Sequence, residues 1–465
     1  MFSKTIKSSG LAHLSYMLGG DGQVAVIDPR RDVDVYIEAA REAGLEITHI
    51  FETHIHADFV SGSRELAAKT GAIMHGGAVK NETQGDYGFD IVSLEEGDCV
   101  EVGPVTFRVL HTPGHSSEHV SYVVRGGGKG ASEEWGVFTG DTLFAGEVGR
   151  PDLEPGADHE ELAKQLFDSL HEKLMKLDDG VEVYPAHGEG SPCGSSIGAR
   201  DRTTIGYERA HNERLHITDC GAFVQALMKE LEESPAPSYY KRLKRINLEG
   251  PEVLGASMQR EIEALDAEKF EARMADAVVL DTREIEAFAG AHIEGALHIA
   301  LRGSFPVWAG RMLDADDDLL LVTHDAQDVK TIREHLLRIG VNLPKGHLSG
   351  GISSWFEAGK PFTSTGLMSV QTLRERLEDE NLQVVDVREP GEWKEGQIHG
   401  ARSIFVPELT KKLDALDASR PVVVYCGSGF RASIAVSVLA RHGFTRVSNL
   451  AGSIKAWKNA GYPLS

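Results

Sequence analysis

The stretch His54-Ile55-His56-Ala57-Asp58-Phe59 carries the residue types of a metal site. In the pattern His-x-His-x-Asp-His the side chains usually supply ligands to two metal ions, and here Phe59 stands at the last histidine position. A phenyl ring cannot coordinate a metal, so a second ion loses a ligand while the first keeps its own. The change favours a single, partly open metal over hydrolysis by two zinc ions.

Further candidate ligands follow predicted strands in the same way as this motif. His115 lies in HTPGH, Asp141 in TGD and His187 in PAHG, each just after an apolar run. Side chains placed after strands can converge on one edge of a sheet, so we expect these residues to share a site with the motif. The strands in question are 47–52, 105–110, 135–139 and 181–184.

Other elements of the first half are expected from periodicity. Strands are predicted at 23–28 and 119–124, and apolar spacings of three and four predict helices at about 33–43, 61–70 and 159–177.

The second half of the chain repeats itself at an offset of about one hundred residues. Asp281-Thr282-Arg283 returns as Asp386-Val387-Arg388, and the run 348–355 returns as 450–457. Apolar strands that lead into helices predict a parallel sheet covered on both faces. We therefore expect an α/β domain at 1–235, a linker at 236–262, and two related α/β domains at 263–362 and 369–465.

The second repeat contains a candidate nucleophile. Cys426-Gly427-Ser428-Gly429-Phe430-Arg431 lies between an apolar strand and a helix that begins near Ala432. A tight loop of backbone N–H groups at a helix N-terminus stabilises a thiolate or a persulfide anion, and Arg431 adds a cation at its mouth. The first repeat has His324-Asp325-Ala326-Gln327-Asp328 instead, without a cysteine, and its aspartates would repel an anion.

Residues 1–235 resemble the metallo-β-lactamase superfamily, and TPGHS, GDTLF and GRPDL resemble its glyoxalase II and persulfide dioxygenase branch. The resemblance implies an αββα sandwich and one ferrous ion, Fe(II), held by His54, His115 and Asp141. His56, Asp58 and His187 would then surround the ligands and orient them. The competing interpretation is a two-zinc thioesterase of the glyoxalase II kind, in which Asp58, Asp141 and His187 hold the second zinc.

Residues 369–465 resemble a rhodanese, and the whole chain is similar to bacterial persulfide dioxygenase–rhodanese fusions of sulfide metabolism. This implies oxidation of a low-molecular-weight thiol persulfide by O2 to sulfite, with sulfur transfer at Cys426 and Arg431 giving thiosulfate. Glutathione, coenzyme A and bacillithiol are all eligible carriers. Residues 263–362 would be an inactive copy that serves as a spacer or a docking surface.

Two residues near the candidate ligands have open roles. Arg150, in GRPD, either binds a carboxylate or the thiol carrier of the substrate, or is an ordinary surface arginine. Cys193 follows His187 by six residues and either accepts or relays sulfane sulfur, or is an inert buried thiol.

Composition excludes several classes of partner. The formal net charge of −23 over 465 residues argues against nucleic acids and anionic membranes. No apolar run reaches the ~20 residues that span a bilayer. Four cysteines in so long a chain make no disulfide framework, and the N-terminus lacks a secretory h-region, so we expect a cytoplasmic protein. Self-association into a homo-oligomer is compatible with this size.

Overall fold

The chain divides into two compact units. In a computed structural model, residues 1–79, 86–128, 133–194 and 196–465 are described. Residues 1–260 with 337–340 form the first unit, and residues 261–336 with 341–465 form the second. Within the described residues, no helix is both long enough and apolar enough to cross a membrane.

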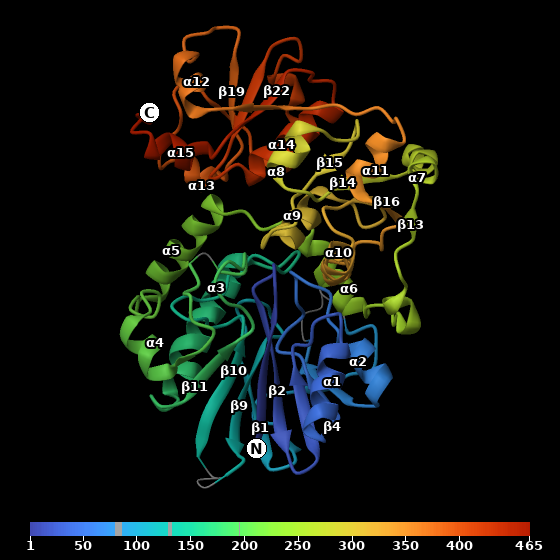
Figure 1. Cartoon of the computed structure of the whole chain (residues 1–465). Coiled ribbons are helices and arrows are strands. Elements are labelled where there is room, and N and C mark those ends of the chain that lie inside the picture. The colour runs from blue at the N-terminus through green and yellow to red at the C-terminus, as the bar shows by residue number, and fades with distance from the viewer. Residues whose placement is uncertain (80–85, 129–132, 195) are drawn as a thin grey trace. The chain divides into compact units, whose positions relative to one another are not determined.

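Two facing mixed sheets form the centre of the first unit (Figure 1). The first sheet has the order β1-β2-β3-β4-β5-β6; β1 to β3 pair antiparallel and β3 to β6 pair parallel. Its strands are β1 (Phe2–Ser8), β2 (His13–Gly20), β3 (Gln23–Ile27), β4 (Glu46–Phe51), β5 (Ile73–Gly77) and β6 (Val92–Leu94). The second sheet has the order β12-β11-β10-β9-β8-β7, and β10 and β11 are its parallel pair. Its strands are β7 (Cys99–Val102), β8 (Val105–His111), β9 (Val120–Gly126), β10 (Glu134–Gly140), β11 (Glu182–Pro185) and β12 (Thr203–Thr204).

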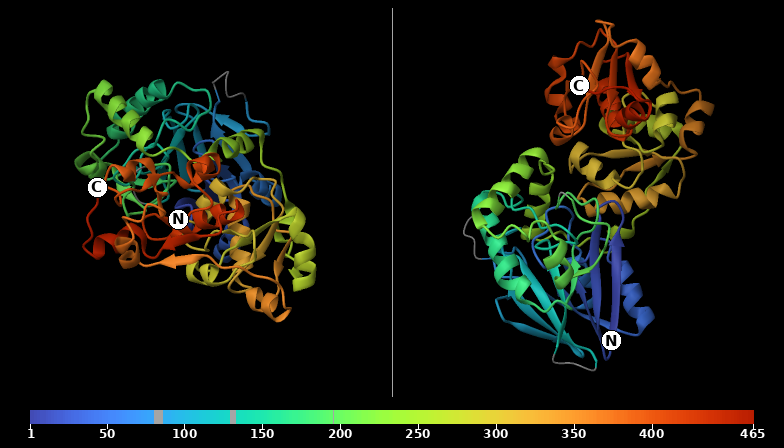
Figure 2. Two further views of the ribbon diagram at one scale, coloured as in Figure 1. Left: turned by 90° about the horizontal axis from the view of Figure 1, so that it is seen from above. Right: turned by 90° about the vertical axis from the view of Figure 1, so that its left-hand side faces the viewer.

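Helices cover the outer face of each sheet, as two further views also show (Figure 2). Tyr36 of α1 packs on the first sheet with Val26, and Leu166 of α3 packs on the second with Val183. Phe51 belongs to a third apolar cluster, which lies between the two sheets. These layers confirm the expected αββα sandwich. The helices of this part are α1 (Asp34–Ala43), α2 (Ser63–Thr70), α3 (His159–Asp168), α4 (Ile205–His211) and α5 (Cys220–Glu233), and a π turn (Ser169–Lys173) and a 3-10 turn (Leu174–Lys176) continue α3.

Of the segment 236–262, which we expected to be a linker, residues 236–260 are built into the first unit. It contains α6 (Tyr240–Glu249) and a 3-10 turn (Gly255–Gln259). The Asn247 amide nitrogen donates to the carbonyls of His56 and Phe59, each at 2.7 Å, and its oxygen accepts from Ser61 N at 2.9 Å. These bonds join the segment to the metal motif, a long-range contact that local composition does not reveal.

The second unit contains two sheets of identical topology, which confirms the sequence repeat. Their orders are β13-β17-β16-β14-β15 and β18-β22-β21-β19-β20, with every pair parallel. The first copy has β13 (Ala264–Leu265), β14 (Val278–Asp281), β15 (Leu297–His298), β16 (Leu319–Val322), β17 (Gly346–Leu348), α7 (Ala267–Arg273), α8 (Ile285–Gly290), α9 (Phe305–Met312), α10 (Asp328–Arg338) and α11 (Gly351–Glu357). The second has β18 (Gly366–Met368), β19 (Gln383–Asp386), β20 (Arg402–Ser403), β21 (Val422–Tyr425), β22 (Val447–Leu450), α12 (Val370–Glu375), α13 (Pro390–Trp393), α14 (Phe430–Arg441) and α15 (Ser453–Asn459).

A buried ion pair recurs at the same place in both copies. The Arg283 guanidinium donates to both carboxylate oxygens of Asp281, with Nη2 at 2.6 Å from Oδ2. Arg388 binds Asp386 in the same way, at 2.7 Å. The repeated Asp-x-Arg sequence therefore encodes a repeated structural element.

Candidate metal centre and cysteine site

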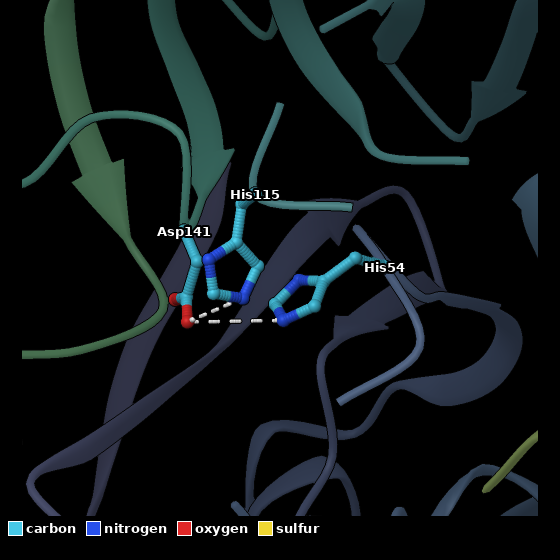
Figure 3. Close-up of side chains that lie close together, drawn as sticks. All are labelled: His54, His115 and Asp141. Carbon is cyan, nitrogen blue, oxygen red and sulfur yellow. Dashed lines mark ion pairs between the residues drawn. The ribbon is translucent and has the colours of Figure 1, made fainter. Parts of the chain in front are cut away.

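Three loops of the first unit bring two histidines and an aspartate together. His54 follows β4, His115 follows β8 and Asp141 follows β10. The Nε2 atoms of His54 and His115 lie 3.8 and 3.5 Å from Oδ2 of Asp141, and both rings point toward this carboxylate (Figure 3). The strand ends thus converge as their positions in the sequence predict.

This group has the chemistry of a metal site. All three side chains are buried, and among the described residues His54 Nε2 and Asp141 Oδ2 have no hydrogen-bond partner. Buried polar atoms are nearly always paired, so orphaned donor atoms aimed at one point fit a shared cation. Burial, followed by the charges of neighbouring histidines, lowers the pKa of His54 and that of His115. Neutral imidazole is the form that binds a metal.

Asp141 is oriented by a histidine that bridges two carboxylates. His187 Nδ1 lies 2.7 Å from Asp141 Oδ1, and its Nε2 lies 2.8 Å from Asp58 Oδ2. Burial alone would lower the pKa of His187, but the Asp141 and Asp58 carboxylates raise it to about 10. A protonated ring donates to both, so Oδ1 of Asp141 is occupied while Oδ2 faces the two histidines. Asp58 and His187 thus form a chain of hydrogen bonds to Asp141, and their role as orienting residues or as ligands of a second metal stays a prediction.

The His56 ring packs on that of His54, with centroids 4.1 Å apart, but its Nε2 faces a different pair of acids. His56 Nε2 is 3.2 Å from Asp28 Oδ1 and 3.3 Å from Glu52 Oε2. Burial opposes a charge on His56, yet these two acids raise its pKa well above the ordinary value. The Phe59 ring packs 4.4 Å from His56 and 4.1 Å from His13, between ring centroids. The position of the last motif histidine is thus filled by an apolar contact.

Cys193 stands beside the same carboxylates. Its Sγ, Asp58 and His187 offer ligand atoms that all lie within 4.8 Å of one another, and all three side chains are buried. Burial, and then the charges of Asp58 and Asp141, raise the pKa of the Cys193 thiol. The thiol is therefore close to the centre and protonated. Whether it relays sulfur stays a prediction.

Sequence reasoning missed a fourth histidine of the centre, His119, which lies four residues after His115. Its Nε2 accepts from Asp141 N at 3.1 Å, and its ring stacks on that of His54 with centroids 5.0 Å apart. Gly140 permits this approach, because a Cβ there would lie 2.5 Å from His119 Nε2. The signal in the sequence was the full run HTPGHSSEH, whose last histidine directly precedes β9.

Arg150 is buried and is not a surface arginine. Its Nε and Nη2 donate to the Asp152 carboxylate at 2.6 and 2.8 Å, and its Nη1 and Nη2 donate to the carbonyls of Pro192 and Ser234. These bonds fix the loop that carries Cys193. The predicted role in substrate binding remains a prediction.

Cys426 lies in a cradle at the N-terminus of α14. Gly429 N donates to Cys426 Sγ at 3.1 Å, and Gly429 adopts a φ of 111°, which only glycine takes easily. Ser453 Oγ lies 3.8 Å from the same sulfur. Both carboxylate oxygens of Glu392 accept from Arg431, so this cation is held in place at the mouth of the loop. The N–H group, the helix N-terminus and the arginine thus place positive partial and full charges around the sulfur.

In the first copy the corresponding loop is closed on itself. Asp325 N donates to the Asp328 carboxylate, and Gln327 N donates to the Asp325 carboxylate. Backbone N–H groups of this loop thus bind the loop's own acids, and the inactivity of this copy stays a prediction.

Comparisons with known proteins agree with this layout. The family model described as Metallo-beta-lactamase superfamily matches residues 9–187, and that described as Rhodanese-like domain matches residues 266–358 and 369–460. A solved structure titled as a metallo-beta-lactamase from Staphylococcus aureus subsp. aureus COL is 32% identical, with a TM-score of 0.67 over 75% of this chain and 99% of that one. The chain therefore belongs to the metallo-β-lactamase superfamily and carries two rhodanese-like domains after its metal-binding domain.

Two other relatives cover a smaller share of the chain. A hydroxyacylglutathione hydrolase from Francisella tularensis subsp. novicida is 32% identical over 180 residues, which are 39% of this chain. The match spans 64% of that relative's length. A solved structure of ETHE1 from Myxococcus xanthus is 30% identical and covers 55% of this chain and all of its own, with a TM-score of 0.43.

Proposed function

We propose that this chain oxidises a low-molecular-weight thiol persulfide with O2 and passes sulfane sulfur through Cys426. In the first reaction RSSH, O2 and H2O give RSH, sulfite and two protons, so the outer sulfur takes up both oxygen atoms of O2. The observation that carries the proposal is that the Nε2 atoms of His54 and His115 converge on one oxygen of Asp141, whereas Phe59 stands where the motif would offer a further histidine to a second ion.

The residues around that point have separate tasks in this proposal. His54, His115 and Asp141 would hold one Fe(II), and such an ion supplies the electrons that activate O2. His187 keeps the Asp141 carboxylate turned so that one oxygen faces the histidines. The thiol of Cys193, beside this carboxylate, would donate a hydrogen bond to the persulfide anion.

The second reaction needs no metal. The Cys426 thiolate attacks the outer sulfur of a persulfide, the S–S bond breaks, and the carrier thiolate leaves. Sulfite then attacks the outer sulfur of Cys426–S–S⁻, which releases thiosulfate and restores the Cys426 thiolate. The Gly429 N–H and the Arg431 guanidinium stabilise the negative sulfur in both steps.

An oxygen electrode with glutathione persulfide tests this division of labour. We expect His115→Ala to abolish O2 uptake and sulfite formation, while His216→Ala, a surface control, leaves both unchanged. Cys426→Ser should abolish thiosulfate formation from persulfide and sulfite but keep O2 uptake, and Cys220→Ser should keep both. Equal loss of the two activities in Cys426→Ser would refute the proposal.

A two-zinc thioester hydrolase is the second candidate. The hydroxyacylglutathione hydrolases among its relatives favour it, and Asp58, His187 and Cys193 offer donors for a second ion. Hydrolysis of lactoylglutathione by zinc-loaded protein under argon, with two zinc ions per chain, would support this function instead.

A further inference from the structure

The pocket over Cys426 is built by both rhodanese-like copies. It has a volume of about 430 Å³ and opens to solvent. Cys426, Arg431 and Glu389 line it from the second copy, and Arg302 and Trp308 line it from the cysteine-less copy. Arg302 lies between β15 and α9, and Trp308 is a residue of α9.

The wall from the cysteine-less copy is fixed against the catalytic helix. His298 N, in β15, donates to Ser437 Oγ of α14 at 3.0 Å, and the His298 ring hydrogen-bonds Ser433 of the same helix. Trp308 is buried, and its ring meets that of Phe430, next to the Cys426 loop, edge-on with centroids 6.5 Å apart. Trp308 therefore keeps its position relative to the nucleophile, and the Arg302 side chain, which is 41% exposed, is held by Glu284 of its own copy.

The size and lining of the pocket indicate an organic ligand. Pockets of roughly 300–1,000 Å³ hold organic molecules of drug size, whereas a water occupies only about 30 Å³ of liquid. Sulfite and thiosulfate are compact anions that contact little of such a volume. A flat indole supplies apolar area, and two arginines supply N–H donors. Arg302 already uses its Nε and Nη2 for Glu284, and Arg431 uses Nη1 and Nη2 for Glu392, so an anionic ligand would share these guanidinium groups with the two glutamates. The pocket is thus suited to an anionic organic thiol carrier.

We propose that the cysteine-less copy recognises the thiol carrier: Arg302 binds its carboxylate and Trp308 packs on its chain while the outer sulfur is transferred to Cys426. The inference rests on the proposed sulfur transfer and specifies its donor as an organic persulfide. The Cys426–sulfur bond forms as the carrier's S–S bond breaks, and the carrier leaves as a thiolate.

Two sulfur donors with one acceptor test the inference. Thiocyanate formation from cyanide is measured with glutathione persulfide and with thiosulfate as donors. We expect Arg302→Gln and Trp308→Phe each to raise KM for glutathione persulfide by about tenfold, because each weakens one charge-assisted or aromatic contact with the carrier. KM for thiosulfate, which has no carrier, should change by less than about twofold. The matched control is Arg273→Gln, because Arg273 and Arg302 have 42% and 41% exposed side chains, each paired to a glutamate.

The remaining outcomes separate this inference from the proposed function. Equal changes for both donors, or no change for either, overturn carrier recognition by Arg302 and Trp308. No thiocyanate from either donor with the unaltered protein overturns the sulfur transfer itself. Thermal melting checks that Trp308→Phe folds. If it does not fold, the inference is tested with Arg302→Gln alone, by comparing its KM for glutathione persulfide with its KM for thiosulfate.

Discussion

Asn247 should control metal retention although no atom of it lies in the metal group. Asn247→Ala removes three hydrogen bonds and leaves the carbonyls of His56 and Phe59 and the N–H of Ser61 without partners in a buried loop. An unsatisfied buried group costs about 1–3 kcal/mol, and water entering the small cavity recovers part of it, so we expect a net loss of about 3 kcal/mol. In a unit of this size that lowers Tm by roughly 6–12 °C.

Asn212→Ala is the matched control for this effect. Asn212 is also buried in the first unit; its amide nitrogen donates to Glu208 and Glu147, and its oxygen accepts from Arg214 N. Both variants should lose comparable stability. Only Asn247→Ala should weaken metal binding, by about tenfold or more, because the loop to which Asn247 is hydrogen-bonded follows directly after His54. Chelator competition and thermal melting measure the two quantities. Metal affinity that falls equally in both variants would show that stability alone, not loop position, sets metal retention.

Three further outcomes are expected. Phe59→His should raise bound zinc from one to two ions per chain by elemental analysis, with Phe59→Leu staying at one; one ion in both would contradict the role of the ring. The pKa of His75, lowered to about 4 by burial and then by a neighbouring histidine, lies below the unfolded value of about 6.5, so only the unfolded chain binds a proton between these values. The free energy of unfolding therefore falls as pH is lowered from 6.5 to 4 and does not change further below pH 4 on account of this group. In thermal melts across that range, His75→Phe should remove about 2 kcal/mol of this pH dependence. Parallel curves of stability against pH for the variant and the unaltered protein would contradict this prediction. Arg388→Ala and Arg283→Ala should each cost about 3–5 kcal/mol in stability by leaving a buried carboxylate unpaired, against less than about 1 kcal/mol for Arg376→Ala, whose side chain is 39% exposed and pairs with Asp379; unequal losses in the first two would show that the copies differ in rigidity.

The sequence predicted those parts of the fold that local patterns encode. Strands at 23–28, 47–52 and 105–110 lie within a residue or so of β3, β4 and β8, because apolar runs bounded by polar loops leave little ambiguity. Strands β1 and β2 were missed: β1 buries few of its residues, so its sequence has no clear alternation. Its pairing with β2, not its own composition, makes it a strand.

The predicted helix at 159–177 is interrupted for a reason that spacing explains. Leu162, Leu166, Leu170 and Leu174 recur every four residues and are all buried. A 3.6-residue turn would rotate such a series around the helix, and a wider π turn at Ser169–Lys173 returns it to the sheet.

The sequence predicted the site residues that directly follow strands, but not the contacts that packing between distant segments creates. His54, His115 and Asp141 each follow a strand of one sandwich, so the fold alone brings them together. The contacts of His119 with Asp141 and of Asn247 with the 56–61 loop depend on tertiary packing, which no local spacing announces. The bonds of Arg150 to the carbonyls of Pro192 and Ser234 show the same limit, because both partners are far away in the sequence.

Two parts of the cysteine-less copy should differ in how well they tolerate substitution: the loop at Asp325 and Asp328, which is hydrogen-bonded to itself, and the edge at His298, which contacts α14. A copy that no longer needs a nucleophile is free to vary at that tip, while its His298 edge must still fit α14. Random mutagenesis scored for sulfur transfer should therefore tolerate almost any residue at 324–328 and very few at 298. In related chains with the same duplication, we expect the sequence to vary most at 324–328 and least where His298 contacts α14.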